Sequence, residues 1–154
     1  MTPKKLFVFF ATAEAVTWTL LLGTLMTRAC VEVPSAVVTA VGGTHGAVFL
    51  GYGVTAALVG VNQRWTFGRI ITGIALAIVP FATVPFERAT IRRGLVDGTW
   101  RTSASDDPRD AHWFDRVFRW FIARPVVLVV SMLVVVAGIF SVLVSLGPPT
   151  EWFN

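Results

Sequence analysis

Long apolar stretches constrain the fold of this chain more than any other feature of its sequence. They cover residues 6–26, 37–61, 70–86 and 125–146, and Glu14 is the one formally charged residue among them. A helix that crosses a bilayer needs about 20 mostly apolar residues, and its backbone groups must be hydrogen-bonded within the segment. We therefore predict an all-α, polytopic membrane protein with four transmembrane helices.

The composition supports a membrane-embedded chain. Hydrophobic residues make up 55% of the sequence and charged residues 14%, whereas soluble domains carry about 25% charged residues. The net charge of +4 comes from basic residues that mostly flank the apolar stretches, where they orient a membrane protein, so nucleic acid is not an expected partner. We expect the chain to lie in the lipid bilayer of a bacterial plasma membrane, together with other integral membrane subunits.

The chain is predicted to have three segments. Residues 1–90 hold the first three spans, residues 91–124 hold a polar loop and a short interfacial amphipathic helix, and residues 125–154 hold the fourth span and a short tail. Aromatic residues on one face of that short helix are typical of a helix lying in the membrane interface, although the same face could pack on a partner. These interfacial anchors are Trp113, Phe114, Phe118 and Phe121.

Small residues recur at helical spacing in the second stretch and predict a seam where helices pack closely. The seam consists of Gly42, Gly46, Gly53, Ala57 and Gly60. In the third stretch, Pro80 and Pro85 each remove a backbone hydrogen bond and predict helix kinks.

Glu14 and His45 are ionisable residues within apolar stretches, where such groups usually face a partner inside the bundle. Each lies ~12 Å from its own end of a span, and across a core of roughly 30 Å their depths would differ by only ~6 Å. We therefore predict a hydrogen-bonded intramembrane pair. The pair could act as a polar clasp between two helices, or as a proton relay or cation site.

The sequence does not indicate an enzyme. It shows no nucleophile–base pair, no paired carboxylates, no glycine-rich phosphate loop and no cluster of zinc ligands. A membrane haem would need a second axial histidine, but His112 lies in the interfacial segment, far from His45. No metal or cofactor is expected.

The basic residues give conflicting signals about orientation. The third connection is rich in arginine, which favours a cytoplasmic location for that loop. Lys4 and Lys5 favour a cytoplasmic N-terminus. With four crossings these two segments lie on opposite sides of the membrane.

Residues 1–90 resemble the YdzA-like small integral membrane proteins. The resemblance rests on "AEAVTWTLLLG", "VGGTHGAVFLGY", "RWTFGR" and "VPFATVPFER" in this order. It implies a three-span bacterial membrane domain without a known reaction. It also implies a shared pattern that includes Glu14, His45, Gly46, Pro80, Glu87 and Arg88. The polar loop, the interfacial helix and the fourth span lie outside the resemblance.

The expected function is that of a non-catalytic accessory subunit that docks on and stabilises a larger membrane complex. By analogy, one candidate host is the actinobacterial respiratory cytochrome bcc–aa3 supercomplex, and a homo-oligomer would suit the same packing surfaces. The alternative is a small proton- or cation-coupled transporter that uses Glu14 and His45. A single early glutamate is also similar to the small multidrug-resistance exporters, although His45 and the long third loop depart from them.

Overall fold

The computed structural model describes residues 1–145, and its regular elements in this range are helices. The chain forms two compact units, one from Met1 to Trp100 and one from Arg101 onward. The first unit includes residues 91–100, which the sequence analysis placed with the polar loop. Each unit is described by itself below.

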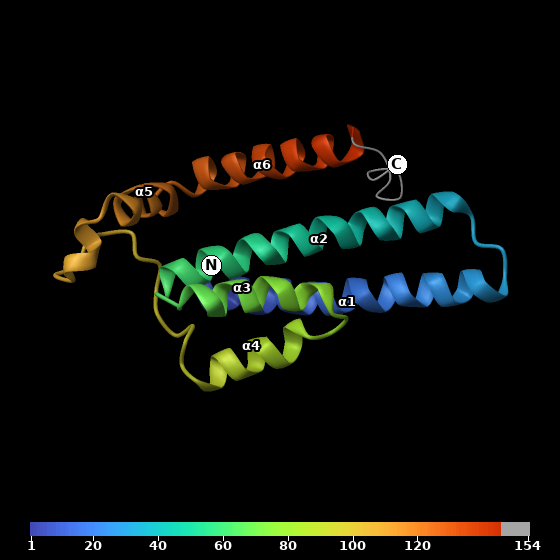
Figure 1. The fold of residues 1–154 in the computed structure, drawn as a ribbon, viewed down its shortest axis with the longest axis horizontal. Coiled ribbons are helices and arrows are strands. Elements are labelled where there is room, and N and C mark those ends of the chain that lie inside the picture. Colours follow the sequence, from blue (N-terminus) through green and yellow to red (C-terminus); the bar gives the residue numbers. More distant parts are fainter. Residues whose placement is uncertain (146–154) are drawn as a thin grey trace. The chain divides into compact units, whose positions relative to one another are not determined.

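Unit 1 is built on two long antiparallel helices, α1 (Pro3–Cys30) and α2 (Ser35–Asn62), which pack against each other (Figure 1). Thr2 caps α1, because its hydroxyl accepts a hydrogen bond from the backbone N–H of Lys5 at 3.2 Å. Each helix has 28 residues and is long and apolar enough to cross a membrane. At 1.5 Å per residue each is ~42 Å long.

The third apolar stretch does not form one span, which corrects the prediction for residues 70–86. The chain runs through α3 (Phe67–Ala75) and η1 (Leu76–Ile78), turns at residues 79–82, and returns as α4 (Thr83–Arg92). α3 packs on α2, and α4 packs on α1 (Figure 1). These elements form a helical hairpin, residues 67–92, in which a Cβ added at Gly73 would lie 2.8 Å from the ring of Phe86.

Polar contacts bring the two ends of the hairpin to one end of unit 1, which we call the base. The Trp65 indole donates to the carbonyl of Leu95 at 2.8 Å, and the Asn62 amide donates to the carbonyl of Thr99 at 2.8 Å. At the same end, Lys4 forms an ion pair with Asp97 at 2.9 Å. The chain therefore enters and leaves the hairpin at the same end of α1.

The tip of the hairpin reaches about half the length of α1. The Trp18 indole donates to the carbonyl of Ala77 at 3.3 Å, and Trp18 lies ~22 Å along the helix from Pro3. Ile78, at the tip, is 68% exposed, and Val79 and Phe81 are also exposed. An exposed apolar tip at this depth suits contact with lipid.

The core of unit 1 lies in the half near the base. Phe7 is fully buried there, and its ring centroid lies 6.0 Å from that of Tyr52, 5.6 Å from Trp65 and 6.3 Å from Phe86. Between residues 18 and 44 no side chain is buried. The half of α1 and α2 beyond the hairpin tip, which we call the open half, is therefore covered by nothing else in unit 1.

Unit 2 contains η2 (Pro108–Ala111), α5 (Trp113–Ile122) and α6 (Pro125–Ser145). Asp110 is buried between Arg101 and Arg119, each 3.1 Å from its carboxylate, and Arg101 also lies 2.8 Å from Asp115. These ion pairs fasten α5 to the preceding loop.

The expected number of spans is not confirmed. Within the described residues, α1 and α2 qualify as membrane spans, and a third would require α5 and α6, bent by 102°, to act together. An all-helical chain with two or three spans is what the structure supports.

Candidate functional site

Buried polar side chains from three helices lie near the middle of unit 1 and form what we call the polar cluster. Its members are Glu14 and Thr17 of α1, His45 and Tyr52 of α2, and Thr83 and Glu87 of α4. The long helices place the first four, and the reversal at residues 79–82 brings the last two back against α1. The cluster thus depends on the hairpin.

Thr17 links α1 to α2. Its hydroxyl donates to the backbone carbonyl of Glu14 at 3.0 Å and lies 3.0 Å from Nδ1 of His45. A hydroxyl has one proton to donate, so the arrangement is satisfied when His45 Nδ1 carries the proton and donates to Thr17. The Trp18 ring lies beside the imidazole, with centroids 4.5 Å apart.

The predicted hydrogen bond between the Glu14 and His45 side chains does not form, because His45 bonds to Thr17, and Thr17 contacts the backbone carbonyl of Glu14 rather than its carboxyl. Glu14 is fully buried, and neither oxygen of its carboxyl has a hydrogen-bond partner among residues 1–145. An isolated ionised carboxylate in an apolar interior is very costly, so such a group is stable when neutral or balanced by a cation. The nearby Trp18 indole donates to the Ala77 carbonyl instead, which leaves the Glu14 carboxyl able to bind a proton or a cation.

Tyr52 is a further buried polar residue of the cluster. It is fully buried and stacks on Phe7, and its hydroxyl has no hydrogen-bond partner in the described chain. The Thr83 hydroxyl, one turn before Glu87, is likewise buried and without a partner among the described residues.

The sequence indicates Thr17 and Tyr52 as further polar contacts of Glu14 and His45, but it does not assign Thr83 or Glu87 to this cluster. A threonine in an apolar helix is unremarkable by itself, and Glu87 is followed by Arg88, which suggests a surface pair. In the structure Glu87 is buried and Arg88 is exposed. The four-residue spacing of Thr83 and Glu87 is the one signal that places them on a common helix face.

The predicted glycine seam divides into a packed half and an open half. A Cβ at Gly60 would lie 2.6 Å from Ile70, and one at Gly53 would lie 3.8 Å from Ile74. Ala57 is half-buried on the same helix. A Cβ at Gly42 or Gly46 would meet nothing within 4 Å. Part of the seam therefore packs on α3, whereas Gly42, in the open half, and Gly46, at its edge beside His45, have open space where a Cβ would be.

The proline and aromatic residues take the following places. Pro80 lies in the turn of the hairpin, and Pro85 lies in the first turn of α4.

On α5, Trp113 is 70% exposed and Phe114 is exposed. Phe121 is half-buried, and Phe118 is buried beneath the Arg101 guanidinium, 5.6 Å from its ring centroid.

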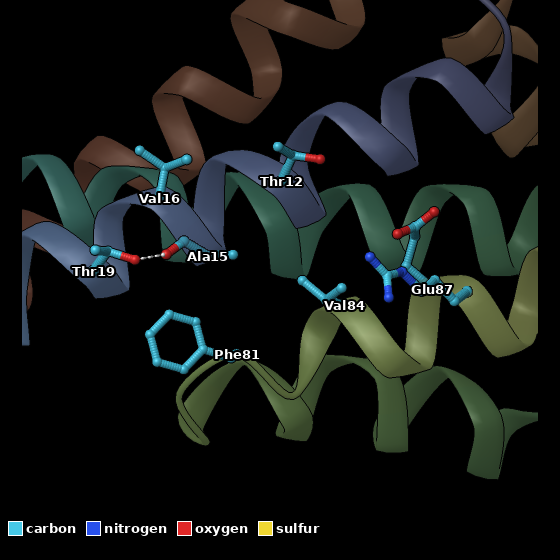
Figure 2. Close-up of a pocket in the computed structure, with 8 residues that line it drawn as sticks. Thr12, Ala15, Val16, Thr19, Phe81, Val84 and Glu87 are labelled. Atoms are coloured by element: carbon cyan, nitrogen blue, oxygen red, sulfur yellow. Dashed lines mark hydrogen bonds between the residues drawn. The ribbon is translucent and has the colours of Figure 1, made fainter.

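A groove of about 340 Å³ runs between α1 and α4 beside the polar cluster (Figure 2). Thr12, Ala15, Val16 and Thr19 line it from α1, and Phe81, Val84, Glu87 and Arg88 line it from the hairpin. Figure 2 shows Phe81 opposite Thr19 at one end, and Glu87 at the other end. The groove therefore has an apolar end near the tip and a charged end nearer the base.

Comparisons with known proteins cover the part of the chain that holds this site. The family model described as "Domain of unknown function (DUF3817)" matches residues 4–92. A Streptomyces coelicolor protein described as a "putative membrane protein" is 33% identical over 91 residues, which are 58% of this chain and 11% of that protein. No solved structure matches the chain. These matches support a membrane protein of unknown function, and the YdzA-like resemblance stays a prediction.

Proposed function

Because the chain belongs to the DUF3817 family, we propose that it is a non-catalytic membrane module that docks on a larger membrane protein and stabilises it. The observation that carries this proposal is the size of the Streptomyces coelicolor relative, of which the matching segment is 11%. A domain of this kind therefore occurs as a minor part of a much longer chain. In the longer protein this domain can contact other parts of the same chain. In the present protein, the equivalent contacts would be made with a separate membrane protein.

The open half of unit 1 offers the docking surface. Gly42, Gly43 and Gly46 have open space where a Cβ would be, and small residues let helix backbones approach closely in lipid. No side chain between residues 18 and 44 is buried within the chain as described. A helix of a partner would bury this surface without displacing any contact of unit 1.

The charges of unit 1 favour a cytoplasmic base in a bacterial plasma membrane. Since the hairpin returns to the base, the N-terminus and residues 93–100 share one side, which supports a common cytoplasmic location for Lys4, Lys5 and the basic residues of α4. Arg28 is at the opposite end of α1. The basic residues at or near the base are Lys4, Lys5, Arg64, Arg69, Arg88, Arg92 and Arg93. Cytoplasmic loops carry such an excess of basic residues.

A pull-down of the tagged full chain from its native membrane in mild detergent, followed by mass spectrometry, tests the docking. We expect stoichiometric recovery of a larger integral membrane protein, and recovery of cytochrome subunits would identify the respiratory supercomplex as the host. Gly46→Leu should abolish this recovery. Gly68→Leu is the matched control, because Gly68 is equally open but lies at the base end of α3.

Two results would contradict the proposal. One is recovery of the wild-type protein alone or only as a homo-oligomer. The other is equal recovery of the partner by wild type and Gly46→Leu, which would exclude the open half as the docking surface. Circular dichroism of both variants must first show the helical content of the wild type.

A second candidate is a small proton- or cation-coupled transporter that uses Glu14 and His45. The buried Glu14 carboxyl, whose oxygens have no partner within residues 1–145, favours it. The purified protein would be placed in liposomes that contain a pH-sensitive dye. Proton flux above that of empty liposomes, lost in Glu14→Gln and kept in Thr19→Val, is the expected result for a transporter. Flux equal to that of empty liposomes would exclude it.

A further inference from the structure

The α1–α4 groove has the dimensions and the polarity of a site for an amphiphile. Its volume of about 340 Å³ lies within the range of small-molecule pockets, roughly 300–1,000 Å³. Val16, Val84 and Phe81 give it apolar walls, and Glu87 lies at its other end (Figure 2). Arg88, the next residue of α4, also lines the groove. An occupant should therefore have an apolar chain and a polar head.

One basic residue, Arg88, lines the groove, and two more lie further towards the base on the same helices. Arg88 is exposed, and Arg92, one helical turn further along α4, is exposed on the same face. Lys5 is exposed two turns before Thr12, on the α1 stripe that also holds Val16 and Thr19. Glu87 is the one acidic residue among those that line the groove, and its side chain is buried rather than exposed.

An anionic phospholipid matches both ends of this groove. A guanidinium binds phosphate oxygens through paired hydrogen bonds, and basic pockets between membrane helices on the cytoplasmic side bind anionic headgroups. The groove lies in the half of unit 1 near the base. We have assigned this half to the cytoplasmic side, where anionic lipids are enriched. A zwitterionic headgroup carries a cation beside its phosphate and adds no net negative charge near Arg88 and Arg92, whereas an anionic headgroup does.

We propose that the α1–α4 groove binds one anionic phospholipid. Its phosphate contacts Arg88, with Arg92 and Lys5 nearby, and one acyl chain lies against Val16, Val84 and Phe81 towards the hairpin tip. This site is separate from the docking surface, which lies in the open half around Gly46. The lipid proposal and the docking proposal can therefore fail independently.

Native mass spectrometry of the full chain in neutral detergent, titrated with phosphatidylglycerol, tests the site. Phosphatidylcholine with the same acyl chains is the neutral probe. We expect one phosphatidylglycerol to bind more tightly than phosphatidylcholine, and Arg88→Gln to weaken it roughly fivefold, the contribution typical of one basic residue near a membrane surface. Arg88→Lys should retain most of the affinity, and Arg28→Gln, at the opposite end of α1, should retain all of it.

Ala15→Phe tests the apolar end, because it fills the groove and leaves every basic residue in place. We expect it to lower phosphatidylglycerol binding as strongly as Arg88→Gln does, while Ala29→Phe, at an exposed position near the far end of α1, has no effect. Wild-type affinity in both groove variants would overturn the proposal. So would equal affinity for the two lipids.

A photo-cross-linking residue at position 84 separates lipid from protein as the occupant. In native membranes we expect cross-links to phospholipid. Cross-links to a partner polypeptide instead would assign the groove to a protein interface and overturn the lipid site.

Discussion

At the scale of single residues, the Thr17 hydroxyl of α1 forms a side-chain hydrogen bond with His45 of α2. It contacts the Glu14 carbonyl and His45 Nδ1, both at 3.0 Å. Hydrogen bonds of this kind between membrane helices contribute about 0.6 kcal/mol on average and up to about 1.7 kcal/mol. The contribution of this single bond to the free energy of unfolding is therefore modest.

We predict that Thr17→Val lowers the free energy of unfolding by about 1 kcal/mol, because His45 Nδ1 loses its partner and the side-chain volume stays nearly the same. Thr19→Val is the control, since the Thr19 hydroxyl bonds only to the Ala15 carbonyl of its own helix, at an exposed position. Unfolding in mixed micelles with increasing denaturing detergent measures both. Equal stability of the two variants would remove the interhelical role of Thr17.

The sequence identified Glu14 and His45 because ionisable residues are conspicuous in an apolar run. It could not show that the two side chains stay apart, with His45 bonded to Thr17 and the Glu14 carboxyl without a hydrogen-bond partner among residues 1–145. The Thr17 hydroxyl could equally have bonded only to its own helix, as those of Thr19 and Thr44 do. Thr83 joins the cluster because of the hairpin, which no local pattern predicts.

At the scale of helices and hairpins, one glycine stripe on α2 serves two environments. Gly60 lies tight against α3, and Gly42 lies in the open half. Spacing along the sequence placed both on one seam. The hairpin is long enough to cover Gly60 but too short to reach Gly42.

We predict that Gly60→Ala destabilises unit 1 by about 1–3 kcal/mol, because the new methyl group would force Ile70 to move within a packed interface. Gly42→Ala should be neutral or stabilising, since alanine favours helix over glycine by about 0.5–1 kcal/mol and meets open space. The same unfolding assay compares the two. A destabilised Gly42→Ala protein would mean that the open half is packed within this chain.

The reversal at residues 79–82 has a topological outcome that labelling can measure. In a Cys30→Ser background, Thr99→Cys should react with a membrane-impermeant maleimide only after the cells are permeabilised. The native Cys30, which is exposed beyond the far end of the bundle, should react in intact cells. A full third span would instead put both positions on the same side, so labelling of both in intact cells would contradict the hairpin.

The sequence supported a span over residues 70–86 because its apolar length is nearly sufficient for one crossing. Two prolines are compatible with a kinked span and also with a complete turn. What selects the turn is a set of contacts between distant residues, above all Trp18 with Ala77 and Trp65 with Leu95. A chain that forms both contacts must turn near the middle of α1 and return to the base.

At the scale of the whole molecule, the division after Trp100 separates two bodies with different means of stabilisation. Unit 1 has an aromatic core around Phe7 and Tyr52. The loop and α5 of unit 2 are joined by the ion pairs of Arg101, Asp110 and Arg119. The family model matches residues 4–92, and this whole region lies within unit 1.

We predict that residues 1–100 alone insert into membranes and unfold at nearly the temperature of unit 1 in the full chain. The contacts at the base, including the Trp100 indole with the Met1 carbonyl at 2.8 Å, lie entirely within this fragment. Size-exclusion chromatography and thermal unfolding in detergent test this. Aggregation of the fragment, with the full chain monodisperse, would show that unit 1 requires the rest of the protein.

The half-length hairpin also makes unit 1 unequal in width. Near the base α3 and α4 flank α1 and α2, whereas the open half contains α1 and α2 only. Such a body takes up more area in one leaflet than in the other, so it acts on the bilayer as a wedge. A partner helix in the open half would even out the two cross-sections. Without one, unit 1 should prefer membrane that bends towards its narrow side, and the distribution of the fragment of residues 1–100 between flat and curved vesicles would report whether the partner is bound.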